Sequence, residues 1–148
     1  MTTNDVLAGK SVLITGANRG LGKALVDEVL TRGVDRVYAA SRRPEGHPDP
    51  RVTALRLDIT EPEQVRAASE QVGSLDVLVN NAAIFVMDDL GDEVAIQDHL
   101  AVNLFGTYDI TMALLPQLTA SRGAIVNVLS LAALATVPIR ADLPAALT

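Results

Sequence analysis

Three glycines near the start of the chain have a spacing that suits a phosphate group. The segment T-G-A-N-R-G-L-G at residues 15–22 follows a short apolar run and precedes an amphipathic one. Glycines permit a tight turn and a close approach of the backbone to a pyrophosphate, and the N-terminus of the following helix attracts the anion. The spacing G-x-x-x-G-x-G differs from G-x-G-x-x-G, and a turn without a ligand is the alternative. We expect a dinucleotide to contact Thr15, Gly16, Asn18, Arg19, Gly20, Leu21 and Gly22.

The segment Ser41-Arg42-Arg43 indicates which dinucleotide binds. An NAD-binding domain places an acidic residue about 20 residues beyond the glycine turn, where it accepts a hydrogen bond from the ribose 2′-hydroxyl. Ser41 occupies that position, so a 2′-phosphate meets no carboxylate. Arg42 can pair with this phosphate through two parallel hydrogen bonds. The cofactor expected is therefore NADP(H), whereas Arg43 is expected to be a solvated loop charge.

The elements that must position these residues alternate between apolar runs and amphipathic stretches. We expect strands at Ser11–Thr15 and at 36–40, 52–57, 75–79 and 124–129, with helices at 21–32, 61–72 and 92–118, the last bent near Gly106. The first helix is expected to place Leu21, Leu25, Val29 and Leu30 on one side. Strands separated by helices at this spacing indicate crossover connections and a parallel sheet. The predicted fold class is α/β, a Rossmann-type doubly wound parallel sheet with strand order 3-2-1-4-5.

Composition excludes several other kinds of protein. The 148 residues are 49% hydrophobic and contain no Cys, which excludes a disulfide scaffold, a thiolate zinc site and a Cys nucleophile. The two histidines, His47 and His99, cannot form a metal cluster alone, so no metal is expected. A net charge of −6 argues against nucleic acid. The apolar stretch 125–139 is too short and too polar to span a membrane, and residues 1–10 lack the apolar core of a signal peptide. We expect a cytoplasmic protein.

The glycine turn, preceded by L-x-G-K, resembles the compact single-domain branch of the short-chain dehydrogenase/reductase family. The resemblance runs from about residue 7 to residue 130 and implies further cofactor contacts. Asp58 and Ile59 match the segment after the third strand that contacts the adenine ring; capping of the following turn by Asp58 is the alternative. Asn81 and Ala82 belong to N-N-A-A at 80–83, which is similar to the family's N-N-A-G. Arg19 stands where family members that prefer NADP carry a basic residue.

Two residues match catalytic positions of that family. Ser130 follows the predicted strand 124–129, and the resemblance implies that it orients the substrate oxygen. Asn103 lies within the predicted helix 92–118, where the resemblance implies that it supports a water that relays protons. A solvated helix residue is the alternative for Asn103. In doubly wound sheets the carboxyl ends of the strands border the ligand crevice, which agrees with the position of Ser130.

The catalytic pair Tyr-x-x-x-Lys of the family has no match. Its Tyr acts as general acid and base, and its Lys lowers the pKa of that Tyr. Here the only tyrosines are Tyr38 and Tyr108 and the only lysines are Lys10 and Lys23, all before Ser130. Loss of a positioned acid/base typically reduces the rate by about 10²–10⁴. We therefore expect low or no activity from this chain.

The resulting prediction has two parts along the chain. Residues 1–130 form an NADP-binding Rossmann domain, and residues 131–148 form a divergent or truncated tail, so that the family's last strands are lacking. By resemblance the domain belongs to an NADP(H)-dependent oxidoreductase that transfers hydride between nicotinamide and a carbonyl or alcohol substrate. The alternative is a non-catalytic dinucleotide-binding or interaction module. The helical region 92–118 resembles an element through which family members pair, which predicts a homo-oligomer.

Overall fold

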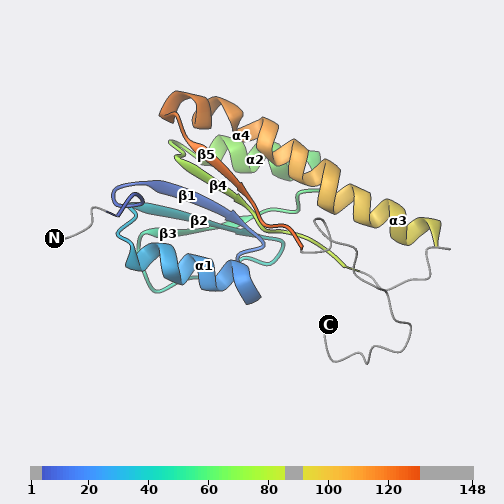
Figure 1. The fold of residues 1–148 in the computed structure, drawn as a ribbon, viewed down its shortest axis with the longest axis horizontal. Coiled ribbons are helices and arrows are strands. Elements are labelled where there is room, and N and C mark those ends of the chain that lie inside the picture. Colours follow the sequence, from blue (N-terminus) through green and yellow to red (C-terminus); the bar gives the residue numbers. More distant parts are fainter. Residues whose placement is uncertain (1–4, 86–91, 131–148) are drawn as a thin grey trace.

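A parallel sheet of five strands forms the centre of the molecule (Figure 1). The structure is a computed structural model and describes residues 5–85 and 92–130. The strands are β1 (Ser11–Thr15), β2 (Arg36–Ser41), β3 (Val52–Arg56), β4 (Val77–Asn80) and β5 (Ala124–Asn127). Their order in the sheet is β3-β2-β1-β4-β5, and every neighbouring pair is parallel. The predicted α/β fold class and strand order are confirmed.

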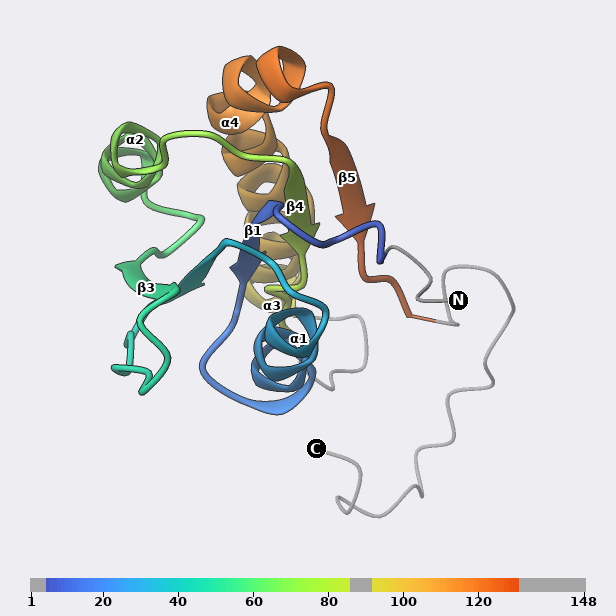
Figure 2. The same cartoon turned by 90° about the vertical axis from the view of Figure 1, so that its left-hand side faces the viewer.

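Helices cover both faces of this sheet (Figure 2). Helix α1 (Gly20–Thr31) lies on one face, and α2 (Pro62–Gln71) and α4 (Thr107–Ser121) lie on the other. The core is correspondingly split into two clusters. One joins β1 and β2 to α1 through Val12, Ile14, Val26, Val29 and Val37. The other joins the sheet to α2 and α4 through Leu13, Leu55, Leu78, Ile110 and Leu114.

Helix α1 packs most of its expected apolar side against the sheet. Val29 is buried in the core cluster, and Leu25 and Leu30 pack against that cluster. Gly22 and Val26 are buried as well, whereas Leu21 is 55% exposed and lines a cavity. Gly22 allows a close approach to the glycine turn, because an added Cβ atom would collide with the carbonyl oxygen of Gly16.

The long helical region from 92 to 118 is built from three pieces. Helix α3 (Glu93–Leu100) continues through a π-helical segment, η1 (Ala101–Gly106), into α4. The Asp92 side chain caps α3 by accepting hydrogen bonds from the backbone N–H groups of Val94 and Ala95. The irregularity expected near Gly106 is thus a widened turn rather than a simple bend. Such π segments occur often at functional sites.

The amino-terminal ends of the strands are tied together by hydrogen bonds to one carboxylate. Asp76, just before β4, accepts hydrogen bonds from the backbone N–H and the hydroxyl of Ser11 and from Lys10 Nζ, at 2.9–3.0 Å. Burial of Asp76 opposes its ionisation, but the hydrogen bonds from Ser11 and Lys10 outweigh burial and lower its pKa. The carboxylate therefore holds β1 against β4 in its charged form.

A second ion pair closes the same end of the sheet beside β3. Arg51 pairs with Asp49 at 2.7 Å and also donates to the backbone carbonyls of Leu30 and Val34 after α1. Hydrogen bonds from Arg51 lower the pKa of Asp49 to about 2. Arg51 thus satisfies carbonyls at the end of α1 and anchors the loop before β3.

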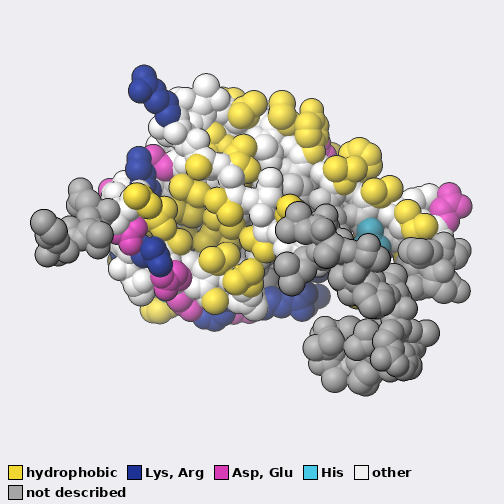
Figure 3. All heavy atoms as spheres, in the orientation of Figure 1, with side chains coloured by type: hydrophobic (Ala, Val, Ile, Leu, Met, Phe, Trp, Pro, Cys, Tyr) yellow, Lys and Arg dark blue, Asp and Glu magenta, His cyan; other side chains and the backbone are white. Residues whose placement is uncertain are grey.

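Strand β5 forms an exposed edge of the described sheet. All four of its residues are exposed, and the apolar side chains of Ile125, Val126, Val128 and Leu129 are between 37% and 72% accessible. Figure 3 shows apolar side chains gathered over this side of the sheet and along α3 and α4. No helix in the described part of the chain is long and apolar enough to cross a membrane. The predicted tail, 131–148, lies outside the described residues.

Candidate functional site

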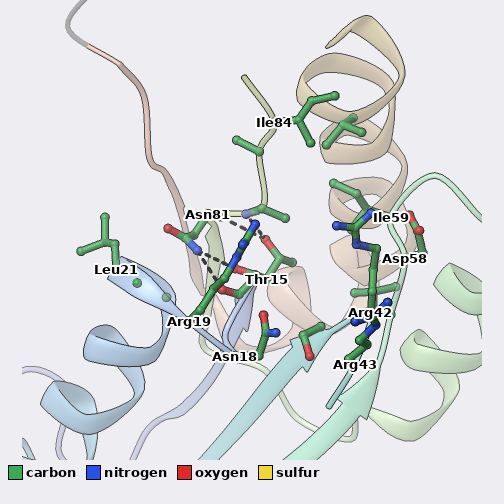
Figure 4. A pocket seen from close by; sticks show the side chains of 18 of the residues that line it. Thr15, Asn18, Arg19, Leu21, Arg42, Arg43, Asp58, Ile59, Asn81 and Ile84 are labelled. Carbon is green, nitrogen blue, oxygen red and sulfur yellow. Dashed lines mark hydrogen bonds between the residues drawn. The ribbon is translucent and has the colours of Figure 1, made fainter. Parts of the chain in front are cut away.

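A cavity of about 680 Å³ lies at the carboxyl ends of the central strands. It contains every residue that the sequence assigns to the cofactor: Thr15, Gly16, Asn18, Arg19, Gly20, Leu21, Gly22, Ser41, Arg42, Asp58, Ile59, Asn81 and Ala82. Figure 4 shows Asn18 and Arg19 on the α1 side of the cavity and Arg42 and Arg43 on the β2 side. This is the place where open α/β sheets bind ligands. Their role in binding a cofactor stays a prediction.

The glycine turn between β1 and α1 has the geometry that its residue types require. Gly16 and Gly20 have φ angles of +67° and +52°, which lie in the left-handed region that glycine adopts readily. Gly22 is the tightest position, since an added Cβ would meet backbone and the Asn81 amide within 2.6 Å. Helix α1 begins at Gly20 and has no acidic residue in its first turn. Its free N–H groups therefore face the cavity as an anion site.

Thr15 locks the glycine turn to the loop after β4. Its hydroxyl accepts hydrogen bonds from the backbone N–H groups of Asn81 and Ala82, both at 3.0 Å. The Asn81 amide in turn donates to the carbonyl oxygens of Thr15 at 2.9 Å and Gly16 at 3.3 Å. Thr15 is only 2% exposed, so these contacts are largely shielded from water. The two loops that line the cavity therefore form one rigid unit.

Positive charge without an acidic partner among the described residues lines the cavity, on the α1 side and on the side of β2 and β3. Arg42 and Arg43 follow β2, Arg56 ends β3, and Arg19 precedes α1; all four line the cavity. Among residues 5–85 and 92–130, none of these four arginines forms an ion pair. Ser41 lies beside them, is 4% exposed, and its hydroxyl has no hydrogen-bond partner in the described structure. A buried hydroxyl without a partner is unfavourable, so this arrangement suits an anionic ligand.

Asp58 and Ile59 form the wall opposite α1. The Asp58 carboxylate accepts hydrogen bonds from the backbone N–H of Thr60 at 3.0 Å and its hydroxyl at 2.7 Å. The turn-capping alternative therefore holds, and Asp58 lines the cavity as well. Ile59 is held from behind by Gly106, where an added Cβ would lie 2.7 Å from its side chain. The close approach of the π-helical segment thus fixes this wall.

A second cavity of about 860 Å³ adjoins the first and contains both predicted catalytic residues. Asn103 and Ser130 line it, together with Tyr108 of α4. The Asn103 amide makes two hydrogen bonds of 2.9 Å with the backbone of Ile84, donating to its carbonyl oxygen and accepting from its N–H. Asn103 therefore positions the loop after β4. Residues 82–84 line both cavities, so this loop is a shared wall.

The sequence did not assign to the cofactor six residues that line the first cavity: Arg43, which was expected to be a solvated loop charge, and Arg56, Leu57, Ala83, Ile84 and Val102. Arg56 enters it because β3 pairs with β2 in a register that sets Arg56 opposite Ser41. Alternation along β3 predicts that Arg56 faces away from the core side of Leu55 and Leu57, but the register is a long-range property. Ile84 and Val102 reach the cavity through the contact between the loop after β4 and η1, for which the sequence gives no local signal.

A sheet of order 3-2-1-4-5 with a glycine turn at its switch point defines a Rossmann-type α/β domain. The family model described as short chain dehydrogenase matches residues 10–145. The chain belongs to this family, which consists of oxidoreductases.

Individual relatives agree with this membership. Estradiol 17-beta-dehydrogenase 2 of Mus musculus is 34% identical and covers 88% of this chain, which matches 38% of that protein. L-fucose dehydrogenase of Bos taurus is 35% identical, with 84% of this chain and 50% of the relative covered. A short chain dehydrogenase of Burkholderia cenocepacia, solved in complex with NADP, has a TM-score of 0.79 at 38% identity, covering 84% of this chain and 54% of that one. The chain thus spans about half the length of its relatives or less.

Proposed function

We propose that the first cavity binds NADP(H). The observation that carries this proposal is the buried Ser41 hydroxyl, which has no partner and lies where an NAD-binding domain places a carboxylate. Arg42 follows it, and Arg19 lines the same cavity without an acidic partner. A 2′-phosphate offers acceptor oxygens to all three groups. The similarity to a dehydrogenase solved with NADP supports the assignment.

The other lining residues suit the remaining parts of this cofactor. The N–H groups at the start of α1 and the glycine turn would hold the pyrophosphate, because no side chain at Gly16 or Gly22 blocks the approach. Asp58 and Ile59 would border the adenine ring. Asn81 and Ala82 are fixed by Thr15 and would form the floor toward the second cavity. NADPH, when bound, supplies the hydride for reduction of a carbonyl.

The reaction proposed is hydride transfer between the nicotinamide and a carbonyl or alcohol substrate. The second cavity would receive the substrate, with Ser130 orienting its oxygen by a hydrogen bond. Asn103 would act through the loop after β4, because its amide is bonded to Ile84. The printed sequence contains no Tyr-x-x-x-Lys, and Tyr38 is buried, with its hydroxyl accepting from the Gly73 N–H. The chain alone should therefore turn over slowly or not at all.

That missing pair favours a second candidate function, a non-catalytic dinucleotide-binding or interaction module. Both candidates require NADPH binding, and turnover separates them. Reduction of a panel of reactive carbonyls by the purified chain with NADPH at ordinary rates would exclude the non-catalytic module. It would also show that Tyr-x-x-x-Lys is dispensable here.

Self-association through the helical region is part of the proposal. Leu100, Leu104, Tyr108 and Met112 recur every four residues from α3 to α4 and are between 44% and 59% exposed. This spacing places them along one side of the helical region. Contiguous exposed apolar surface marks interaction sites in soluble proteins. Light scattering of the purified chain measures its oligomeric state, and a monomer at all concentrations would contradict this part.

The cofactor proposal is tested by titration with NADPH and NADH, followed by fluorescence or calorimetry. We expect saturable binding with a preference for NADPH. Ser41→Asp should weaken NADPH binding at least about 10-fold, because a carboxylate beside the 2′-phosphate repels it, while NADH binding is retained. Ser41→Ala removes only one hydrogen bond and serves as the uncharged control. The proposal would be refuted if the wild-type chain, shown by circular dichroism to be folded, had no saturable NADPH binding.

A further inference from the structure

Arg56 lies at the carboxyl end of β3, the edge strand beside β2. It is the last residue of β3, and the register of β2 with β3 sets it directly opposite Ser41, the last residue of β2. Both residues line the first cavity. Their positions place an exposed guanidinium on the neighbouring strand, beside a buried hydroxyl that has no partner.

The alternation of side chains places the two groups on the same face of the sheet. Ala40, Leu55 and Leu57 belong to the core cluster on the α2 and α4 side. Successive residues of a strand point to opposite faces, so Ser41 and Arg56 both point to the α1 side. The glycine turn and the start of α1 border the cavity on that side. Arg56 therefore faces the cavity from β3, whereas Arg42 reaches it from the loop after β2.

The charge of Arg56 is not used within the described structure. Other arginines away from the cavity, namely Arg32, Arg51 and Arg66, each pair with a carboxylate at 2.7 Å. No such pair involves Arg56 in residues 5–85 and 92–130. Arg56 therefore has no carboxylate partner among the described residues, and it lines a cavity whose buried Ser41 hydroxyl also lacks a partner. Guanidinium groups suit phosphate because their N–H donors match its oxygens in pairs.

We infer that Arg56 is a specificity-determining residue for a phosphomonoester on the ribose of the bound dinucleotide. Ser41, Arg42 and Arg56 form a three-sided site, with the hydroxyl at its floor and one guanidinium from each of two neighbouring strand ends. This assignment rests on the proposed NADP(H) binding and extends it to β3. It predicts discrimination between NADPH and NADH by a residue far from the glycine turn in sequence.

The test compares three variants by the ratio of their Kd values for NADPH and NADH. Arg56→Gln should weaken NADPH binding about 10-fold and leave NADH binding unchanged, since one charge-assisted hydrogen-bonding group is lost. Arg56→Lys keeps the charge but loses the paired donors, and its loss should be smaller. Arg122→Gln is the matched control, because Arg122 is exposed, lines neither cavity, and its removal changes the net charge equally.

The outcomes separate this inference from the proposed function. If the wild-type chain does not bind NADPH, the proposed function fails first. If it binds NADPH and Arg56→Gln leaves the NADPH/NADH ratio unchanged, the role of Arg56 is refuted while NADP(H) binding stands. Equal losses for Arg56→Gln and Arg122→Gln would also refute it, since general electrostatic attraction would then account for both. Circular dichroism and thermal melting verify that each variant is folded, and 2′,5′-ADP as a competitor tests the phosphate contact without nicotinamide.

Discussion

The two ends of the sheet differ in whether their charged side chains have partners. At the amino-terminal end, Asp76 is surrounded by donors from Lys10 and Ser11, and Arg51 pairs with Asp49. At the carboxyl end, four arginines line a cavity without forming an ion pair among the described residues, and the Ser41 hydroxyl lacks a partner. Ion pairs and hydrogen bonds thus fix carboxylates at the first end, whereas the cavity arginines at the second end have no carboxylate partner among the described residues.

This difference separates residues that stabilise the fold from residues kept for a ligand. Paired charges with low carboxylate pKa values contribute to folding stability directly. Buried polar groups that lack a hydrogen-bond partner are concentrated at functional sites. The folded protein tolerates them because the surrounding structure holds them in place. Here Thr15 supplies that support, since it joins the glycine turn to the loop after β4. Substitutions at the two ends should therefore affect different measurable properties.

The largest effect is expected from Gly22→Ala at the carboxyl end. The added Cβ would lie 2.2 Å from the Gly16 carbonyl oxygen, so the glycine turn has to move. We expect loss of detectable NADPH binding and destabilisation by about 1–3 kcal/mol, the range for overpacked sites. Titration with NADPH and thermal melting measure both. Gly46→Ala is the control, because nothing lies within 4 Å of its added Cβ; equal behaviour of the two variants would contradict the steric argument.

A smaller effect is expected from Thr15→Val, which keeps the shape and removes the hydroxyl. The N–H groups of Asn81 and Ala82 would lose their acceptor, which destabilises by about 1–3 kcal/mol. NADPH affinity should fall as well, because both loops line the cavity. Urea denaturation measures the change in stability. Thr15→Ser should restore most of it, and failure of this rescue would show that the methyl group, rather than the hydroxyl, is what matters.

The smallest effect is expected from Asp76→Asn at the amino-terminal end. This variant should lower the free energy of unfolding by about 1 kcal/mol at neutral pH and leave the preference for NADPH over NADH unchanged. The pKa of Asp76 is lower in the folded protein than in the unfolded chain. Its contribution is therefore complete above the ordinary Asp pKa of about 3.9 and is lost as the pH falls toward the folded pKa. Melting temperatures between pH 7 and pH 3 should fall less steeply for the variant than for the wild type. Asp98→Asn, at an exposed position on α3, is the control. A changed ratio of the Kd values for NADPH and NADH in Asp76→Asn would contradict the assignment of stability to one end of the sheet and cofactor binding to the other.

Local patterns were sufficient to predict the sheet and the placement of most cavity residues. Apolar runs followed by helical periodicity predicted all five strands, and parallel crossover connections bring the carboxyl ends of β1, β2 and β4 to one edge. The glycine turn, Ser41 and Asn81 each follow one of these strands, so their gathering could be expected from chain order. The irregularity at Gly106 was also expected, although its π-helical form depends on close packing against Ile59.

Features that depend on packing between distant segments could not be predicted. Leu21 shares its side of the helix with Leu25 and Val29, but it is 55% exposed and lines the cavity, which spacing alone does not indicate. Arg56 looks like a solvated edge charge until the register with β2 is known. The two hydrogen bonds of Asn103 with Ile84 connect segments 19 residues apart, and only the structure shows them.

The shared wall at residues 82–84 gives the two cavities a common boundary. A molecule that shifts this wall from one side changes the shape offered to a molecule on the other side. For any such pair of molecules, thermodynamic reciprocity requires that each alter the affinity of the other by the same factor. The two hydrogen bonds between Asn103 and Ile84 oppose such a shift, because they hold this wall to η1.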